Sequence, residues 1–478
     1  MSFNFSQAAL HPDDIKGCHD VIDNLWDLVR DLKEKLGTNS KNSSKRPSSE
    51  IDKPATSKTN SPKEKSKNKR KQGAQKGHNK HTRELVPIET VDHIKKCPPK
   101  RQCDCNGLVI PTGQYSRKQK FDFPVIKPIV TEYQLQEGTC SCCSKRHVGQ
   151  LPDRIPSFIL GPRGIALVGT LTGCYRISKR NVVALFHDIY NFKISSGSIC
   201  KAEKLVSAAL ERPVEAAKHF IKDKQTEVHA DETGHKEKGK RMWAWVAVAC
   251  MISIFIIRPS RGRKSAEELL GSEFAGILIT DRWSAYSWVK TSHRQVCWAH
   301  LLRDFQKISE RHGQSNIIGN ALIKLTNQMF RYWHKMKTGV KSRDQFEKYM
   351  GAKIPEFEYL FKRGRRCKNK KTKGTCKEIL KIKEALWTFV YKESVEPTNN
   401  LAERTIRTHV IWNKTSFGTQ STGGTLYMER ILTVVGSCKL QGMNVLDYLS
   451  EAVTSYYNDK QYPSLIPGKY SVAFAEAV

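Results

Sequence analysis

Apolar residues near the N-terminus recur at alternating spacings of three and four positions. This heptad spacing begins after His19 and predicts an amphipathic helix that ends at Gly37. Two interpretations remain open: a short coiled coil of about two heptads that joins two copies of the chain, or a helix that packs on its own chain. The residues of the predicted apolar face are Ile22, Leu25, Val29, Leu32 and Leu36.

Hydrophobic positions almost disappear between Thr38 and Lys80, where Ser, Asn, Lys and Pro predominate. A segment with so little to bury is predicted to be a disordered cationic linker. Its densest charge run either keeps the linker solvated or contacts nucleic-acid phosphates without sequence preference. The candidate phosphate contacts in this run are Lys67, Lys69, Arg70 and Lys71.

A helical pattern returns between Ser178 and Leu205. Ser178 is placed to cap a first helix, the pattern breaks at 191–193, and Ser195 opens a second helix. This spacing is compatible with a helix-turn-helix that reads DNA, and also with any two short packed helices.

Strand patterns dominate the next segment. A short strand is predicted to end at Asp231, and a Gly-bearing polar turn follows it. The run from Met242 to Ile257 is almost wholly apolar but shorter than the roughly 20 residues that cross a bilayer, so it predicts two buried strands. After a helix over 265–270, the buried strand 276–280 is followed directly by Asp281. Two carboxylates are therefore expected at the ends of neighbouring strands.

Such an arrangement suits phosphodiester chemistry, because two Mg²⁺ ions about 3.5–4 Å apart need bridging and flanking carboxylates. The segment PTNNLAERTIR supplies a third acid, Glu403. Asn400 and Glu403 also have the spacing of a capping box, so Glu403 is either a metal ligand or a residue that satisfies backbone donors at a helix start. Arg404 and Arg407 follow on the same predicted helix and are placed to bind phosphates.

The charge balance indicates the class of partner. Lys and Arg exceed Asp and Glu by 34, which favours a polyanion: nucleic acid first and an anionic membrane surface second. The N-terminus has no cationic segment followed by an apolar stretch, so no secretory signal is predicted and the chain is expected in the cytoplasm. A length of 478 residues predicts several domains.

The 14 cysteines, in a reducing compartment, indicate metal ligation or burial rather than disulfides. Two cysteine clusters predict one tetrahedral zinc site, with buried free thiols as the alternative. The expected zinc ligands are Cys103, Cys105, Cys140 and Cys143. Cys297 and His300 also lie one helical turn apart; packing of a hydrogen-bonded His in a core helix is favoured over half a metal site.

The region 316–390 is predicted to be an all-helical insertion that is interrupted by the basic loop KRGRRCKNKKTKG. This loop is either solvated or bound to DNA, and the density of its positive charge favours DNA. Arg365 and Arg366 are the central candidates for phosphate contacts.

Together these motifs resemble those of the insertion sequence 66 transposases, members of the DDE group with a ribonuclease H-like catalytic core. The resemblance covers nearly the whole chain. It includes LGTNSKNSSKRPSSE, KQGAQKGHNKHTR, the cysteine region, HADETG, ITDRWSAY, VCWAHLLRDF, TNNLAERTIR and LDYLSEAV. The resemblance implies that Asp231, Asp281 and Glu403 form the metal-binding triad. It further implies that water first cuts at the element's ends and that the exposed 3′-hydroxyl then attacks target DNA.

The sequence departs from the family pattern at two places. Arg282 and Trp283 stand where a smaller pair is usual, and IWNKTSFG replaces a more typical Arg-Lys pairing after the third acid. Neither change removes a carboxylate, but the second leaves the local phosphate contacts open. The irregular first cysteine cluster leaves the zinc ligands open in the same way.

The expected fold is α/β: a ribonuclease H-like core with a helical insertion, preceded by a coiled-coil helix, a basic linker, a small cysteine-rich zinc-binding unit and a helical DNA-binding segment. The expected partners are double-stranded DNA, both at the element ends and at the target, a second copy of the chain on that DNA, and accessory proteins. No membrane partner is expected. The expected cofactors are Mg²⁺ or Mn²⁺, and Zn²⁺. The chain is expected in the cytoplasm with the nucleoid. The expected domains are 1–37 (coiled coil), 38–90 (linker), 91–150 (cysteine-rich), 151–222 (helical), 223–310 and 393–440 (core), 311–392 (insertion) and 441–478 (C-terminal segment).

Three other functions compete with a transposase. A DNA-binding regulator with an inactive core is disfavoured because all three acids are present. A structure-selective nuclease that cuts but never joins has the same residues, and only a strand-transfer assay separates the two. A zinc-dependent binding module explains the N-terminal half and leaves the triad unexplained.

Overall fold

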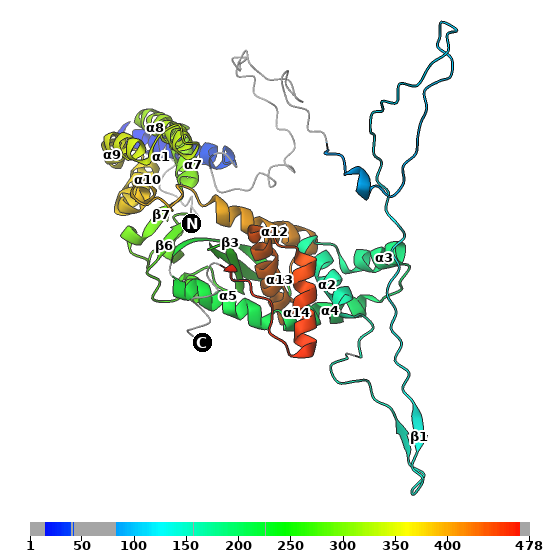
Figure 1. Cartoon of the computed structure of the whole chain (residues 1–478). Helices are drawn as coiled ribbons and strands as arrows, with labels where there is room; N and C mark the ends of the chain where they lie inside the picture. The colour runs from blue at the N-terminus through cyan, green and yellow to red at the C-terminus, as the bar shows by residue number, and fades with distance from the viewer. Residues whose placement is uncertain (1–14, 40–41, 43–82, 156, 225, 469–478) are drawn as a thin grey trace. The chain divides into compact units, whose positions relative to one another are not determined.

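The computed structural model describes residues 15–39, 42, 83–155, 157–224 and 226–468 (Figure 1). The chain forms two compact units. One comprises Lys53–Pro128, and the other comprises Met1–Asp52 with Ile129–Val478. No helix among the described residues is long and apolar enough to cross a membrane.

The described part of the smaller unit contains little regular structure. It has one short 3₁₀ helix, η2 (Ile88–Thr90), and an isolated bridge between Gln102 and Leu108. Side chains bonded to the backbone hold the segment together: the Arg117 guanidinium donates to the carbonyl oxygen of Val86 at 2.6 Å.

The N-terminal helix α1 (Ile15–Leu36) confirms the helix predicted to end before Gly37. Its expected apolar face is exposed at all five positions, so this face does not pack on the described part of the chain. The C-terminal turn of α1 is anchored instead through Glu34, whose carboxylate accepts from Arg311 at 3.0 Å and from Lys371 at 2.9 Å. The coiled coil between two chains stays a prediction.

A five-stranded mixed sheet lies at the centre of the larger unit, with the strand order β5-β4-β3-β6-β7. The strands β3, β4 and β5 are antiparallel neighbours, whereas β6 runs parallel to β3 and β7 parallel to β6. Their bounds are β3 (Glu227–Glu237), β4 (Lys240–Ala249), β5 (Ile252–Arg258), β6 (Ile277–Thr280) and β7 (Arg294–Val296).

The expectation that the first strand ends at Asp231 is wrong. β3 continues to Glu237 because it pairs with β4 from His229 onward, with Asp231 opposite Val246 and Glu237 opposite Lys240. The turn lies at Lys238 and Gly239, which both have positive φ, as the two central residues of a tight hairpin require. The apolar run that follows forms β4 and β5, as predicted.

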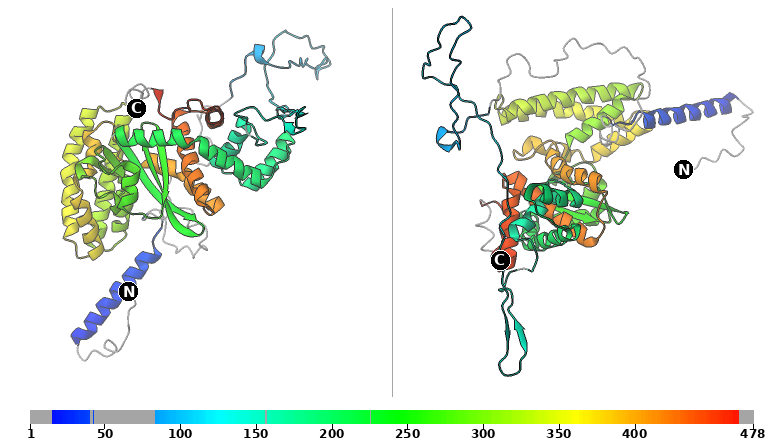
Figure 2. Two further views of the ribbon diagram at one scale, coloured as in Figure 1. Left: turned by 90° about the horizontal axis from the view of Figure 1, so that it is seen from below. Right: turned by 90° about the vertical axis from the view of Figure 1, so that its right-hand side faces the viewer.

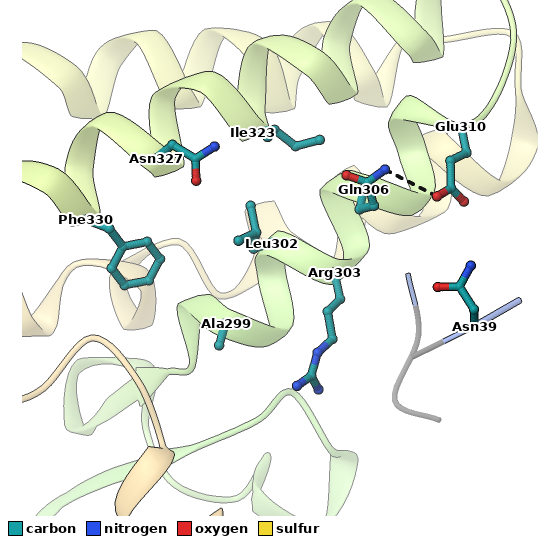
Figure 3. Close-up of a pocket in the computed structure, with 9 residues that line it drawn as sticks. All are labelled: Asn39, Ala299, Leu302, Arg303, Gln306, Glu310, Ile323, Asn327 and Phe330. Atoms are coloured by element: carbon teal, nitrogen blue, oxygen red, sulfur yellow. Dashed lines mark hydrogen bonds between the residues drawn. The ribbon is translucent and has the colours of Figure 1, made fainter. Parts of the chain in front are cut away.

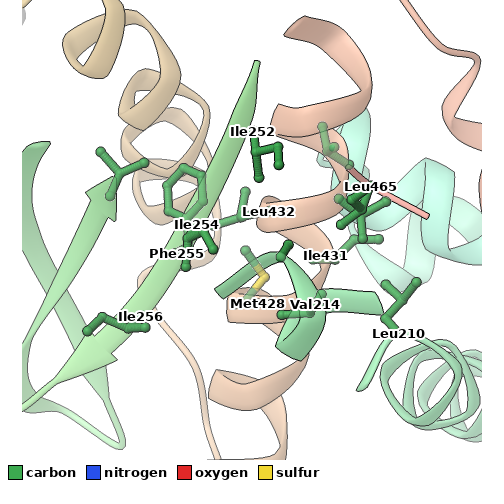
Figure 4. Packing of buried hydrophobic residues seen from close by; sticks show 14 of the residues in the cluster. Leu210, Val214, Ile252, Ile254, Phe255, Ile256, Met428, Ile431, Leu432 and Leu465 are labelled. Carbon is green, nitrogen blue, oxygen red and sulfur yellow. The ribbon is translucent and has the colours of Figure 1, made fainter. Parts of the chain in front are cut away.

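Helix α13 (Thr422–Gln441) covers β5 and completes the main core (Figure 4). Leu432 and Met428 of α13 pack with the β5 residues Ile254 and Phe255 in this cluster. Burying one such side chain contributes about 1.5–3 kcal/mol. Gly436 permits the close approach, since a Cβ there would lie 2.1 Å from Ser253 Oγ.

The same helix also satisfies the open edge of the sheet. Edge strands leave backbone N–H groups unpaired, and buried groups of this kind need partners. Three polar residues of α13, each four positions apart, accept from alternate residues of β5. Glu429 accepts from the N–H of Ile257 at 2.6 Å, Thr433 from that of Phe255 at 3.0 Å, and Ser437 from that of Ser253 at 3.1 Å.

Helices precede the sheet. Ser178 and Ser195 cap α3 and α4 with their hydroxyls, and Asn191 ends α3 in the left-handed conformation, as the sequence predicts. The π-helical turn η3 separates α2 from α3. The bounds of this segment are β1 (Glu137–Thr139), β2 (Arg146–Val148), α2 (Pro162–Gly169), η3 (Thr170–Cys174), α3 (Lys179–Tyr190), α4 (Ser196–Ala209) and α5 (Glu211–Lys224).

The helices between β7 and α12 lie together beside the sheet (Figure 2). A second hydrophobic core forms among them and includes residues of β6 and β7. The aromatic residues Trp298, Phe305, Phe357 and Phe389 are fully buried in it. Its helices are α7 (Trp298–Ser309), α8 (Gln314–Lys337), α9 (Arg343–Arg365), α10 (Lys370–Lys381), η6 (Glu384–Leu386) and α11 (Thr388–Tyr391). The remaining elements are α6 (Arg263–Leu270), η4 (Ser284–Tyr286), η5 (Thr291–His293), α12 (Asn400–Ser416) and α14 (Val445–Asn458).

The expected basic loop in this region is largely helical. α9 extends to Arg365 and α10 begins at Lys370, so only four residues separate the helices. The tight junction is possible because Gly364 lets α10 approach, with Cys376 Sγ 2.3 Å from where a Cβ would be. Asn369 then caps α10 by accepting from the N–H of Thr372 at 3.0 Å.

Candidate active site

The strand register places Asp231 beside Asp281. β3 and β6 are parallel, and His229 pairs with Ile279. Asp231 lies two positions after His229, and Asp281 lies two positions after Ile279. Continuing the parallel register therefore sets Asp231 opposite Asp281. Paired residues of adjacent strands project to the same face of a sheet. Both residues are half-buried.

Local hydrogen bonds orient both carboxylates. Asp231 Oδ1 accepts from the N–H of Glu232 at 2.9 Å. Asp281 Oδ1 accepts from the N–H of Trp283 at 2.8 Å, which is an Asx-type turn directly after β6. In each case one carboxylate oxygen is held by the backbone, which leaves the other for a ligand.

Glu403 enters the site from the first turn of α12. The helix cap is Asn399 and not Asn400, and Asn399 makes no side-chain bond to the helix. Its amide instead donates to the carbonyl oxygen of Ala230 at 2.8 Å, while its Oδ1 accepts from His229 Nδ1 at 3.1 Å. The sequence prediction of Asn400 as the cap is therefore wrong, because Asn399 is needed to bind α12 to β3.

The capping-box alternative for Glu403 is also wrong. Glu403 Oε1 is buried and has no hydrogen-bond partner among the described residues. The nearest basic group is His300, whose Nδ1 lies 3.6 Å away. The side chain thus satisfies no backbone donor at the start of α12.

The acids repel one another. Burial raises the pKa of Asp231 well above its usual value, and the charges of Glu232, Asp281 and Glu403 raise it further. A divalent cation would relieve this repulsion, and an all-oxygen donor set is the type that Mg²⁺ and Mn²⁺ prefer. The residues therefore fit such a cation. Their oxygens do not all lie within 4.8 Å of one another, but ligands that serve two ions about 3.5–4 Å apart need not do so.

Glu232 is a member of this acidic cluster that the sequence reasoning missed. Its carboxylate accepts from Arg261 at 2.7 Å and from the Tyr286 hydroxyl at 2.6 Å. The Arg261 guanidinium also lies 3.8 Å from the centre of the Trp283 ring, a cation–π contact. One signal for Glu232 was available in the sequence, its place directly after Asp231 in the HADETG motif. Its partners Arg261 and Tyr286 lie far away in the sequence and could not be inferred from the motif.

The structure fits the expected core packing of Cys297 but not the hydrogen bond expected for His300. Cys297 is fully buried, and its Sγ accepts from the N–H of Asn399 at 3.2 Å. Burial raises the pKa of this thiol to about 11. His300 Nδ1, however, has no hydrogen-bond partner among the described residues. Cys297, His300 and Glu403 could together hold a metal ion, because their ligand atoms all lie within 4.8 Å of one another. In the described part of the chain, no other group of three or more His, Cys, Asp or Glu residues does so.

The expected zinc ligands lie in two clusters, one in each unit, and their joint site stays a prediction. Hydrogen bonds from the backbone and side chain of Cys105 lower the pKa of Cys103. The backbone N–H groups of Cys143 and Cys142 lower the pKa of Cys140 at the tip of the β1–β2 hairpin. The alternative of buried thiols is wrong, since Cys140 is partly exposed and the other three ligands are exposed.

The candidate phosphate contacts are on the surface where they are described. Arg404 and Arg407 are exposed on α12, and Arg365 and Arg366 are exposed at the α9–α10 junction. None of these four arginines forms an ion pair with a described residue. The run Lys67, Lys69, Arg70 and Lys71 lies outside the described residues.

A separate cavity of about 490 Å³ lies between α7 and α8 (Figure 3). It lacks the acidic residues of the sheet. Arg303 and Gln306 give it a polar side, and Leu302 and Phe330 give it an apolar side. The lining residues are Asn39, Ala299, Leu302, Arg303, Gln306, Glu310, Ile323, Asn327 and Phe330.

Comparison with known families identifies the family of this chain. The profile described as "Transposase IS66 family" matches residues 170–426, more than half of the chain, and this range includes Asp231, Asp281 and Glu403. The chain belongs to the IS66 transposase family. A second profile, "Family of unknown function (DUF6444)", matches residues 14–84 of this IS66 family member. The first match agrees with the resemblance seen in the sequence motifs.

One curated relative is the uncharacterized protein y4qI of Sinorhizobium fredii (strain NBRC 101917 / NGR234). It is 29% identical over 199 residues, which cover 38% of the IS66 family member described here and 36% of y4qI. The alignment therefore spans little more than a third of that relative.

Proposed function

We propose that this IS66 family member is a DDE transposase that cuts DNA at the ends of its element and joins the freed 3′-hydroxyl to target DNA. The catalytic residues of the proposal are Asp231, Asp281 and Glu403. The observation that favours it most is the convergence of acids from three separate segments. Asp231 lies on β3 and Asp281 directly after the parallel strand β6, where the continued register sets them opposite each other. Glu403 lies closely enough to raise the pKa of Asp231.

The proposed core is ribonuclease H-like, and the sheet topology supports this. The first three strands form an antiparallel meander, and the next two continue the sheet in parallel on the side of β3. α12 then returns to the centre and is bonded to β3 through Asn399. The helices between β7 and α12 are proposed as the insertion, and the domain boundaries expected from the sequence belong to the same proposal.

Asp231, Asp281 and Glu403 would hold two Mg²⁺ or Mn²⁺ ions, which supply charge stabilisation to the attacking and leaving oxygens of the phosphodiester. The chain's own residues prepare this site. Trp283 N–H fixes one oxygen of Asp281, and Asn399 fixes the start of α12 against Ala230. Tyr286 and Arg261 hold the Glu232 carboxylate in place beside Asp231, by a hydrogen bond and an ion pair.

The DNA-binding part of the proposal rests on exposed cations. Arg404 and Arg407 follow Glu403 on α12, so phosphates bound by them would lie next to the acids. Arg365 and Arg366 offer a second contact, and the net charge of +34 favours association with a polyanion. Oligomerisation on DNA, accessory proteins, a cytoplasmic location with the nucleoid, and zinc bound by Cys103, Cys105, Cys140 and Cys143 complete the proposal.

The decisive experiment incubates the purified full-length chain with a DNA fragment that carries the element's flanking ends, in Mg²⁺. Nicks at the ends together with joined products support a transposase. Nicks without joined products would identify a nuclease that only cuts. Binding without nicks would identify a DNA-binding regulator with an inactive core.

A further inference from the structure

Three chain segments meet at the start of α7. Cys297 follows β7, and its N–H donates to the carbonyl oxygen of Thr280 at 2.8 Å. The N–H of Trp298 donates to the carbonyl oxygen of Pro397 at 2.9 Å. The N–H of Asn399 donates to Cys297 Sγ at 3.2 Å. The end of β6, the start of α7 and the segment before α12 are thus fixed to one another by backbone groups.

His300 and Glu403 face each other within this frame. His300 lies one helical turn after Cys297 on α7, and Glu403 lies in the first turn of α12. His300 Nδ1 and Glu403 Oε1 are 3.6 Å apart, which is too long for a good hydrogen bond. Both atoms are buried, and neither has a hydrogen-bond partner among the described residues. Buried polar atoms without partners are rare and often mark the place of a ligand.

The donor set indicates the kind of ligand. A thiolate, an imidazole and a carboxylate are the groups that bind Zn²⁺ and similar borderline-soft ions, whereas Mg²⁺ prefers oxygen ligands only. The three ligand atoms already lie within 4.8 Å of one another. Three protein ligands would leave a fourth tetrahedral position open for water or a substrate oxygen.

We propose that Cys297, His300 and Glu403 form a second metal site, one for Zn²⁺ or a similar borderline-soft divalent ion. The site shares Glu403 with the carboxylate triad, and to that extent it rests on the proposed function. Asp231 and Asp281 are not part of it. Binding of the ion by the thiol and the imidazole is measured without DNA and without catalysis.

The experiment titrates the metal-free, reduced full-length chain with Co²⁺, a spectroscopic substitute for Zn²⁺, and records thiolate-to-cobalt charge-transfer absorption. Cys297→Ser is expected to bind one ion fewer per chain than the wild type and to lose part of this absorption. His300→Ala is expected to lose the same ion. The matched control is Cys376→Ser, which removes another fully buried thiol, in α10, and should bind as many ions as the wild type. Ions bound by the N-terminal cysteines contribute equally to all four proteins and cancel in the difference.

Equal cobalt stoichiometry in the wild type, Cys297→Ser and His300→Ala would overturn the proposal. If Cys297→Ser does not fold, His300→Ala decides the question alone, because its Nδ1 has no hydrogen bond to lose. Asp231→Asn separates this site from the proposed function: it should keep the cobalt absorption and lose DNA cleavage. The two assays are independent. If Cys297 and His300 bind no metal, the cleavage assay can still show a transposase; if the wild type does not cleave DNA, the difference in bound cobalt between the wild type and the variants can still be measured.

Discussion

Asn399 donates from its side-chain amide to the backbone carbonyl of Ala230, across 2.8 Å. This bond joins the residue before α12 to the residue before Asp231. This amide therefore fixes the start of the helix that bears Glu403 against the strand that bears Asp231.

The first prediction concerns this amide. Asn399→Ala leaves the carbonyl of Ala230 and Nδ1 of His229 without partners in a buried place, which should lower the free energy of unfolding by about 1–3 kcal/mol. Cleavage should fall further than the population of folded protein does, because Glu403 loses its fixed position. Denaturant unfolding and cleavage under folded conditions measure the two effects.

Asn413→Ala provides the control. The Asn413 amide also joins α12 to β3, by donating to the carbonyl of Gly234 at 3.3 Å, but at a later turn of the helix. This variant should lose a little stability and keep its cleavage rate. Equal losses of cleavage in both variants would mean that Asn399 acts only through stability.

The second prediction is that Asp281→Asn abolishes cleavage and leaves DNA binding nearly intact. An amide oxygen can still accept from the N–H of Trp283, so the turn after β6 is kept while the negative charge is lost. A gel-shift assay measures binding, and a nicking assay measures cleavage. Asp304→Asn, which breaks only a nearby ion pair with Arg282, is the control and should still cleave. Retention of more than a small fraction of cleavage by Asp281→Asn would remove Asp281 from the site.

Local patterns predicted much of this architecture. The caps Ser178 and Ser195 act on their own helices, and the apolar strands from Met242 to Ile257 follow from β-branched and aromatic content. Asp281 was placed correctly for the same reason, since it directly follows a buried strand. The triad itself was suggested by two observations: the family resemblance of the motifs, and the expected position of Asp231 and Asp281 at the ends of neighbouring strands.

Long-range contacts account for what was missed. β3 was predicted too short because its second half is stabilised by β4 and by nothing in its own sequence. Asn399 was passed over for Asn400 because its role depends on Ala230. His300 and Glu403 lie close together because α7 and α12 both begin at the same end of the sheet. Spacing along the sequence could not predict this contact.

The third prediction concerns pH and Asp231. The folded-state pKa of Asp231 is raised, first by burial and then by neighbouring acids. Its contribution to stability is thus present at low pH and is lost as pH rises through the folded pKa. Without divalent metal, Asp231→Asn should melt at a higher temperature than the wild type at neutral pH, and the difference should shrink in acid. Thermal unfolding in chelator across this range measures it. A difference that is constant with pH would mean that Asp231 does not titrate among these neighbours.

The fourth prediction concerns the linker charges, which lie outside the described residues. Neutralising Lys67, Lys69, Arg70 and Lys71 together should weaken binding to all DNA sequences. It should also flatten the salt dependence, by a slope of about 0.9 for each phosphate contact that is lost. Binding titrations at several salt concentrations give the slope. An unchanged slope would mean that the run is only a tether.

The last prediction separates charge from shape at Glu403. Glu403→Gln keeps the size and the helix preference of the side chain, and the native carboxylate accepts no hydrogen bond that the amide would lose. The variant should therefore melt close to wild type and bind element ends normally, yet fail to cut them at any Mg²⁺ concentration, because metal ligation needs the negative charge. Glu396→Gln is the matched control: it lies shortly before α12 and loses only an exposed ion pair with Lys337, a contact worth about 0–1 kcal/mol, so it should cut normally. Cleavage by Glu403→Gln at a near wild-type rate would show that the proposed triad is wrong, and Glu393 would be the next carboxylate to test.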